Sequence, residues 1–317
     1  MDARGPEAYI SRVRSLVILG LTGAVALVAP ACLVEIKDLS AAGGAGGEGA
    51  PGGVGGSNTG TGTGTGAGGG SAACPDDMVH ATHPSFPEVS FCIDRTEVTA
   101  EAYTQFLVGV GDVNGTEQPP ECAGNTELTR TDAGSNCPTW NAGDDTAVNC
   151  VDWCDAYAYC AWAGKRLCGD FEGGALAFDA PVTNDEWQFA CSGGFETAYP
   201  YGDSGQICAC YIPQEWDDKM MCDLPAGTNF NHKVAVGSHS DCEGGFPGMF
   251  DMQGNAAEWT NRCEPPNGMG TERCSLRGGA TFSLNGSSYF TCDNLDQSDE
   301  RLDPVLEAGI RCCKDAN

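Results

Sequence analysis

Cysteine is the residue type in this sequence with the widest range of chemistry, and the chain has 19 of them. Two pairs of cysteines have a spacing that zinc ligands can have: Cys150 with Cys154, and Cys208 with Cys210. Neither pair is accompanied by a second CxxC-like pair or by clustered histidines, so zinc is disfavoured. No recognisable catalytic constellation includes the four histidines, which are His80, His83, His232 and His239. The compartment of the protein therefore decides what the cysteines do, because oxidising surroundings favour disulfides.

The N-terminal segment has the order of features found in a secretory signal. Arg4, Arg12 and Arg14 lie before or at the start of an apolar run over residues 16–30. This run of about 15 residues is shorter than the roughly 20 that a membrane-spanning helix needs. The sequence therefore predicts a signal peptide over residues 1–31, removed on export.

Small residues directly before Cys32 indicate how the exported chain is held. The segment Val28-Ala29-Pro30-Ala31 resembles the lipobox at which bacterial lipoprotein precursors are cleaved. We therefore expect lipidation of Cys32, with a membrane contact through the lipid anchor. The protein would then lie on the bacterial cell envelope, in the periplasm or at the outer membrane or cell surface. The alternative is ordinary signal cleavage, which releases a soluble protein.

Export also sets how the remaining cysteines are counted. Setting Cys32 aside leaves eighteen, and an even number is what complete pairing requires. The sequence thus allows up to nine disulfides.

Acidic residues dominate the charge, which is -28 for the whole chain. Such a surface repels nucleic acid and anionic lipid headgroups, so no nucleic-acid partner is expected. A cation or a basic partner would suit it, but solubility is the simpler explanation.

Composition divides the chain into a signal, a linker and a folded part. Residues 32–72 are rich in Gly, Thr and Ser, and they have too little apolar surface to offset the entropy of ordering. We expect a flexible tether there. Residues 73–317 carry aromatic residues and cysteines throughout without a second linker, which predicts one domain.

Within that domain the periodicity indicates a mixture of short elements. Residues 89–96 are typical of a strand, and Thr99 is an expected N-cap for a helix that reaches about Val108. A second helix is predicted after Asp152, with Gly164 available to end it. The abundant Gly, Pro, Asn and Asp elsewhere favour a loop-rich α+β domain stapled by disulfides.

Five sequence segments carry a family resemblance. They are FCIDRTEVT at 91–99, WCDAYAYCAWAGKRL at 153–167, GMFDMQGNAAEWT at 248–260, LRGG at 276–279 and GIRC at 309–312. In this order they resemble the formylglycine-generating-enzyme, or sulfatase-modifying-factor, family. The resemblance implies an irregular, loop-rich, disulfide-rich α+β fold related to C-type lectin-like domains.

The resemblance also implies a catalytic pair that this chain lacks. The resemblance implies copper-dependent oxidation of a substrate cysteine to formylglycine. In the family this reaction uses two enzyme cysteines, the first of which lies shortly after the Gly-Gly that corresponds to Gly278-Gly279 here. Those positions are Ser283 and Ser288 here, and no cysteine lies between Cys274 and Cys292. Cu(I) is soft and takes thiolates, whereas a serine hydroxyl is a hard neutral oxygen. Copper is therefore not expected, and no catalytic residue is assigned.

A turn sequence in the third segment resembles the family's structural calcium site. The candidate ligands are Gly254, Asn255, Ala256 and Glu258. Calcium takes six to eight oxygens, and a turn that directs two carbonyls beside a carboxylate supplies several of them. The alternative is a tight turn whose Asn and Glu cap a helix.

Four disulfides are expected from two kinds of inference. The resemblance implies Cys160–Cys312 and Cys191–Cys292, whereas Cys74–Cys92 and Cys263–Cys274 are predicted from proximity in the sequence. The segment from Cys168 to Thr183 is an insertion relative to the family.

These inferences favour one functional hypothesis over another. The first is a non-catalytic binding module on the cell envelope, whose partner is an unidentified peptide, glycan or envelope component. This hypothesis is preferred because function does not follow from a fold whose site residues are gone. The second is a formylglycine-generating-type oxidase or another oxidoreductase of the same fold that recruits other cysteines.

Overall fold

The computed structural model describes residues 74–129, 144–203, 210, 234–279 and 291–316. All of them fall in one unit, Gly66–Asn317. The expected signal peptide, the whole tether with Cys32, Ser283 and Ser288 lie outside the described residues. In the described ranges, no helix combines the length and the apolar character that crossing a bilayer requires.

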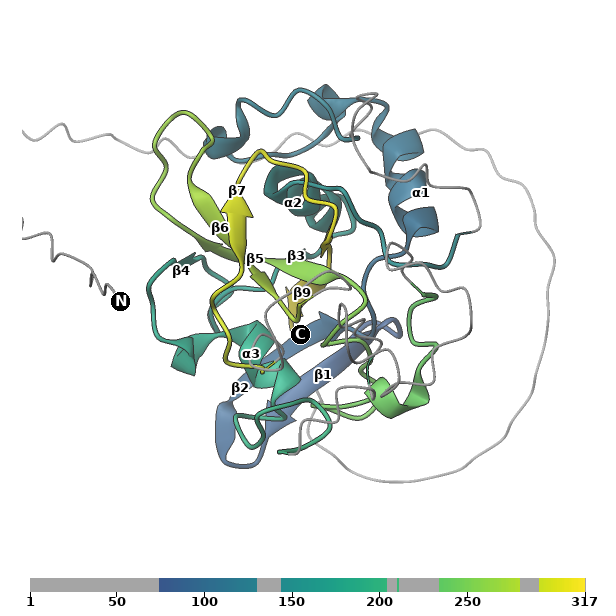
Figure 1. Cartoon of the computed structure of the whole chain (residues 1–317), viewed down its shortest axis with the longest axis vertical. Helices are drawn as coiled ribbons and strands as arrows, with labels where there is room; N and C mark the ends of the chain where they lie inside the picture. Colours follow the sequence, from purple (N-terminus) through teal and green to yellow (C-terminus); the bar gives the residue numbers. More distant parts are fainter. Residues whose placement is uncertain (1–73, 130–143, 204–209, 211–233, 280–290, 317) are drawn as a thin grey trace, which may run out of the picture. The chain divides into compact units, whose positions relative to one another are not determined.

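A first sheet is built from the two ends of the described chain (Figure 1). Its strand order is β1-β2-β9-β3, and every pairing is antiparallel. The strands are β1 (Met78–His83), β2 (Phe86–Asp94), β9 (Cys312–Asp315) and β3 (Arg166–Leu167). The strand expected over residues 89–96 corresponds to β2, which begins earlier because it forms a hairpin with β1.

A second sheet has the order β4-β5-β6-β7, and β8 also pairs with β5. Its strands are β4 (Leu176–Ala177), β5 (Ala257–Cys263), β6 (Arg273–Arg277), β7 (Ser298–Glu300) and β8 (Ala308–Gly309). Both β4 and β8 run parallel to β5, whereas β6 is antiparallel to it.

Three α-helices and four short 3-10 helices complete the described elements. The α-helices are α1 (Ala100–Val110), α2 (Trp153–Trp162) and α3 (Glu186–Cys191). The 3-10 helices are η1 (Val113–Gly115), η2 (Pro120–Cys122), η3 (Val182–Asn184) and η4 (Ser240–Cys242). Thr99 caps α1 and Asp152 caps α2, as the sequence predicts. Gly164 follows α2 with φ +68°, a conformation that favours glycine.

Two hydrophobic clusters lie on either side of β9. The first packs α1 and α2 against β5 through Phe106, Tyr159 and Trp259. The second packs α3 on the hairpin of β1 and β2, with Phe91 and Phe189 at its centre. Figure 1 shows α3 beside this hairpin. Successive side chains of a strand point to opposite faces, so Cys312 enters the first cluster and Cys313 the second.

Disulfides connect these elements. The described part of the chain contains the four pairs that the sequence analysis names, Cys74–Cys92, Cys160–Cys312, Cys191–Cys292 and Cys263–Cys274. It also contains Cys122–Cys154, Cys168–Cys313 and Cys210–Cys242. Cys150 is disulfide-bonded as well. The structure is therefore the irregular, disulfide-rich α+β fold that was expected.

Two acidic residues are buried at the start of α2. Asp152 accepts a hydrogen bond from the Asp155 amide at 2.8 Å, and Asp155 accepts one from the Asp152 amide at 3.3 Å. Asn125 donates to Asp155 at 2.9 Å. Burial raises the pKa of Asp152 to about 7, and the backbone hydrogen bonds oppose this rise only in part. Burial and the nearby Asp152 also raise the pKa of Asp155.

The raised pKa of Asp152 predicts a pH-dependent stability. An unfolded Asp loses its proton near pH 4, whereas the folded state keeps it up to about pH 7, so the free energy of unfolding falls as pH rises between these values. Asn also caps helices, so Asp152→Asn should keep α2 and reduce this fall by about 4 kcal/mol. Urea unfolding at a series of pH values measures the effect.

Asp112→Asn is the matched control, because Asp112 caps the exposed turn η1 through the amide of Asn114. We expect that variant to keep the pH dependence of the parent protein. An Asp152→Asn variant with an unchanged slope between pH 4 and 7 would contradict the assignment.

Candidate functional site

The loop that leads into β5 has an unusual backbone. Asp251 and Asn255 have φ values of +58° and +52°, and Gly254 has +76°. Left-handed backbone at non-glycine residues costs of order 1–3 kcal/mol each, and it persists only where the surroundings hold it. The Asp251 carboxylate accepts from the Gly237 amide at 2.5 Å, and the Gly254 amide donates to the Gly278 carbonyl at 3.0 Å. Strain of this kind marks the loop as a candidate functional segment.

Glu97 holds the loop from the connection between β2 and α1. Its two carboxylate oxygens accept from the Asn255 side-chain amide at 2.9 Å and from the Ala256 backbone amide at 2.8 Å. The Asn255 side-chain oxygen in turn accepts from the Val234 amide at 3.0 Å. Both the oxygen and the nitrogen of the Asn255 side-chain amide thus form hydrogen bonds. These bonds explain why the Asn255 backbone is held in the left-handed region.

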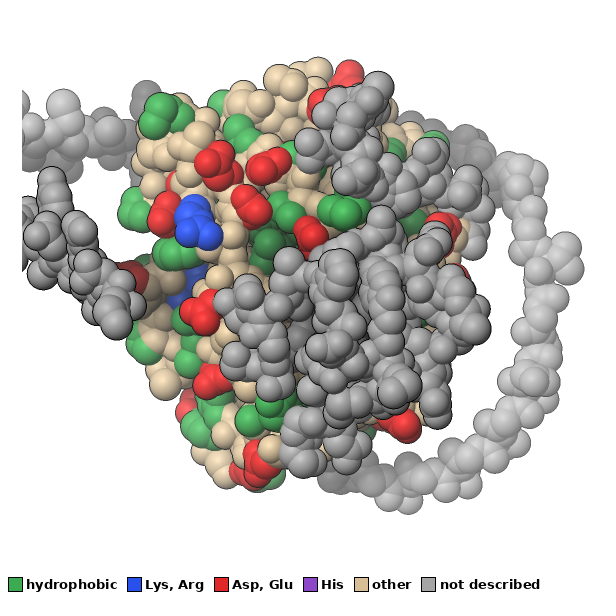
Figure 2. Space-filling view, in the orientation of Figure 1, with side chains coloured by type: hydrophobic (Ala, Val, Ile, Leu, Met, Phe, Trp, Pro, Cys, Tyr) green, Lys and Arg blue, Asp and Glu red, His purple; other side chains and the backbone are tan. Residues whose placement is uncertain are grey.

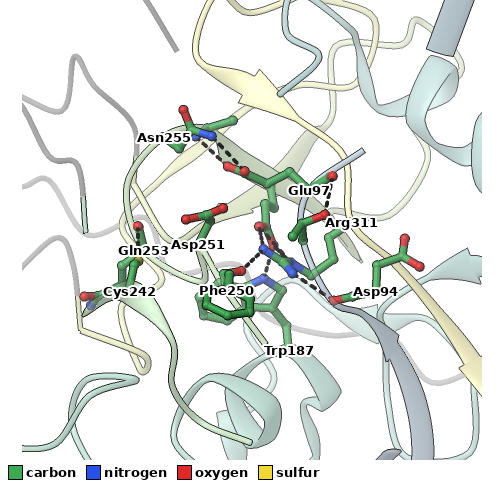
Figure 3. Close-up of polar contacts among 12 residues, drawn as sticks. Asp94, Glu97, Trp187, Cys242, Phe250, Asp251, Gln253, Asn255 and Arg311 are labelled. Atoms are coloured by element: carbon green, nitrogen blue, oxygen red, sulfur yellow. Dashed lines mark hydrogen bonds and ion pairs between the residues drawn. The ribbon is translucent and has the colours of Figure 1, made fainter. Parts of the chain in front are cut away.

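Arg311 is the cation of the site and is fully buried. Its Nε donates to the two oxygens of Glu258 at 2.8 and 3.0 Å. Its other two nitrogens donate to the carbonyls of Asp94 and Phe250, each at 2.8 Å. The Trp187 indole completes the arrangement by donating to Glu258 at 2.6 Å. Figure 3 shows these contacts converging between β2, the loop and the α3 segment.

Carboxylates outnumber the cation in this buried cluster. Burial raises the pKa of Glu97 well above its ordinary value, and the negative charges of Asp251 and Glu258 add to the rise. Burial also raises the pKa of Glu258, although Arg311 opposes it. The same holds for Asp251, whose hydrogen bond from Gly237 opposes the rise. One guanidinium cannot neutralise three carboxylates, so this cluster carries more acidic groups than Arg311 alone can pair with.

The four predicted calcium ligands are close together, but one is already occupied. Gly254, Asn255 and Ala256 form the strained turn, and the turn leads into β5 rather than into a helix. Both oxygens of Glu258 accept hydrogen bonds from Arg311 and Trp187. The Arg311 guanidinium therefore occupies the position at Glu258 that a calcium ion would need, so the Glu258 carboxylate does not fit the role of a calcium ligand. Metal analysis of the folded domain tests the calcium prediction itself.

Several members of the cluster were not predicted. Glu97, Asp251 and Arg311 lie inside the segments 91–99, 248–260 and 309–312, whose order along the chain was the available signal. Trp187 lies outside all of them, and nothing in the sequence marked it. Gln253 was missed as well, although it is buried and its side-chain amide has no hydrogen bond within the described ranges. Ser283 and Ser288 lie outside these ranges, so their place relative to the cluster is not described.

The chain matches the family model described as "Sulfatase-modifying factor enzyme 1-like domain" over residues 64–316. Among curated proteins, it is 30% identical over 116 residues to the formylglycine-generating enzyme of Mus musculus, covering 35% of this chain and 26% of that protein. It is 32% identical over 177 residues to the inactive C-alpha-formylglycine-generating enzyme 2 of Mus musculus, covering 52% and 48%. The chain thus spans about a quarter to a half of these relatives.

Solved structures show a weaker likeness. CarF is 20% identical, with a TM-score of 0.46 over 72% of this chain and 87% of that one. PvdO from Pseudomonas aeruginosa is 21% identical, with a TM-score of 0.45 over 71% and 80%.

Arg311 yields a stability prediction. Arg311→Met removes the cation and leaves Glu258 buried without its ion pair, so we expect a loss of about 3–5 kcal/mol in the free energy of unfolding. The double variant Arg311→Met, Glu258→Gln removes both charges and should recover part of that loss. Chemical denaturation of the single and double variants gives the coupling energy between the two residues.

Arg273→Met is the control, because Arg273 is exposed and its side chain makes one hydrogen bond, to the Ser298 carbonyl. Its effect should stay within about 0.5 kcal/mol. If Arg311→Met were as mild as Arg273→Met, the buried ion pair would not hold the loop.

Proposed function

From the premise that this chain belongs to the sulfatase-modifying factor enzyme 1-like domain family, we propose that it is a non-catalytic binding module. In this proposal the domain is exported, held on the bacterial cell envelope through a lipid on Cys32, and lifted from the membrane by the tether. Its ligand is a peptide, a glycan or another envelope component. The observation that carries the proposal is the presence of Ser283 and Ser288 where the resemblance implies a cysteine pair.

Ligand chemistry supports the absence of copper oxidation. A Cu(I) site needs soft donors, and a serine hydroxyl is a hard donor that stays protonated at neutral pH. A hydroxyl also cannot replace a thiol in a redox step, because it forms no disulfide. Ser283 and Ser288 therefore can neither bind Cu(I) nor take part in the thiol oxidation that the family resemblance implies.

The enzymatic alternative needs thiols from elsewhere. All fifteen cysteines with a described position are disulfide-bonded, and a disulfide sulfur offers no thiolate. Many of these disulfides are buried and join distant segments, as Cys160–Cys312 does across 152 residues. A structural role accounts for them, so the described part of the chain gives the oxidase hypothesis no free thiol.

Two properties support a place outside the cytoplasm. Dense disulfides are typical of oxidising compartments, and the seven pairs within the described ranges fit that environment. The surface is acidic, and Figure 2 shows Asp and Glu side chains spread over one face with little Lys or Arg. A nucleic-acid partner is disfavoured on this charge.

A copper assay tests the proposal. We expect the wild-type domain, incubated with Cu(I), oxygen and a cysteine-containing peptide, to bind no stoichiometric copper and to form no aldehyde on the peptide. Ser283→Cys, Ser288→Cys restores two soft ligands and should therefore gain Cu(I) binding. Metal analysis after gel filtration and mass spectrometry of the peptide give the two readouts.

Ser283→Cys alone is the matched control, because it supplies only one of the two soft ligands. This variant should not gain tight copper binding. Stoichiometric copper on the wild-type protein, or aldehyde in its reaction, would refute the non-catalytic proposal.

A further inference from the structure

A cavity of about 760 Å³ lies beside the N-terminus of α2. Its walls come from α2, from the segment around β4, and from the end of β5 with the residues that follow it. The apolar lining includes Trp153, Tyr157, Leu176, Phe178, Pro265 and Pro266. Ligand sites are concave and mostly apolar, with volumes of roughly 300–1,000 Å³. The cavity has the size and lining of a small-molecule site.

One wall belongs to the segment from Cys168 to Thr183, which is predicted to be an insertion relative to the family. This wall is held by several contacts. Leu176 and Ala177 pair with Arg262 and Cys263 of β5. The buried Arg262 guanidinium donates to the carbonyls of Ala177, Phe178 and Ala180 at 3.3, 3.3 and 2.7 Å. The wall is thus fixed by the sheet and by one buried cation.

Among the described residues that line the cavity, Arg301 is the only basic one, and its charge is paired with that of Glu272. Its Nε donates to Glu272 at 2.7 Å, and both side chains are less than 5% exposed. The guanidinium also stacks over the Trp153 ring at 4.4 Å. The cavity therefore gains no net positive charge from Arg301.

Carboxylates give the lining of the cavity a net negative charge. Glu121, Asp179 and Glu264 line it. Glu121 also lines an adjoining hollow of about 300 Å³ together with Glu272. One oxygen of Glu121 and one of Glu272 are buried without a hydrogen bond to any described residue. A desolvated carboxylate oxygen is costly unless it receives a donor, so both oxygens call for N–H groups from a ligand. Glu272 is already paired with Arg301, whereas the charge of Glu121 is not met by an ion pair within the described ranges, so the ligand should also bring positive charge.

We propose that the cavity binds a small organic cation, an amine or guanidine on an apolar body. The charged end reaches Glu121 near Glu272, and the body packs between the Tyr157 and Phe178 rings, where aromatic faces also favour a cation. The net negative lining of Glu121, Asp179 and Glu264 supplies the complementary charge. This inference deepens the proposed binding function, on which it rests, by naming a ligand class.

Calorimetric titration with three phenyl probes tests it. They are 2-phenylethylammonium, neutral 2-phenylethanol and anionic 3-phenylpropionate. We expect the ammonium probe to bind, more weakly as salt is added, and the other two to bind at least tenfold more weakly. Glu121→Gln should lower the affinity for the ammonium probe about tenfold. Ala175→Trp, at an exposed lining position, should fill the cavity and abolish binding.

Glu88→Gln is the control, because Glu88 is an exposed acid on β2 away from the cavity, and it should bind like the parent. Thermal melts of all variants establish that each is folded. Failure of the ammonium probe to bind, preference for the neutral or anionic probe, or equal affinities of Glu121→Gln and Glu88→Gln would overturn the proposal. The copper assay decides separately whether the domain is catalytic, so a failure of this inference can be told apart from a failure of the proposed function.

Discussion

The bidentate contact between Arg311 and Glu258 is the interaction on which the rest of this structure depends. The guanidinium joins β5, the end of β2 and the strained loop at one buried point. A buried ion pair contributes little net stability over an apolar replacement, but losing one partner is costly. The pair therefore acts mainly on specificity, because arrangements that separate these three segments leave a charge buried without a partner.

Local signals in the sequence were sufficient for part of this fold. Thr99 and Asp152 mark helix starts through hydrogen bonds made within one turn, so neighbouring residues suffice to predict them. Contacts between distant segments were harder. Cys168–Cys313 spans 145 residues, and sequence alone does not determine which cysteine meets which. The prediction of Glu258 as a calcium ligand, which stays untested, used one turn of the sequence, and no local signal shows that Arg311 contacts Glu258 from 53 residues away.

Membership of a family does not by itself assign a function to this chain. The segments that carry the family resemblance contain Glu97, Asp251, Glu258 and Arg311 of the ion cluster, which positions the loop entering β5. The cavity beside α2 is built largely from other residues, and one of its walls comes from the segment 168–183. The scaffold thus places the buried ion cluster and the cavity in different parts of the domain, so a change in the lining of the cavity need not disturb the ion cluster.

The adjacent cysteines of β9 impose an order on how this protein matures. Cys312 and Cys313 are tied to Cys160 and Cys168, one in each hydrophobic cluster. Both of these disulfides therefore wait for one short strand to dock, because Cys160 and Cys168 meet their partners only when β9 joins the first sheet. The disulfides Cys122–Cys154 and Cys191–Cys292 involve neither cysteine of β9. A substitution that delays the docking of β9 would thus leave two reduced cysteines in each cluster, where they could pair with the wrong partner.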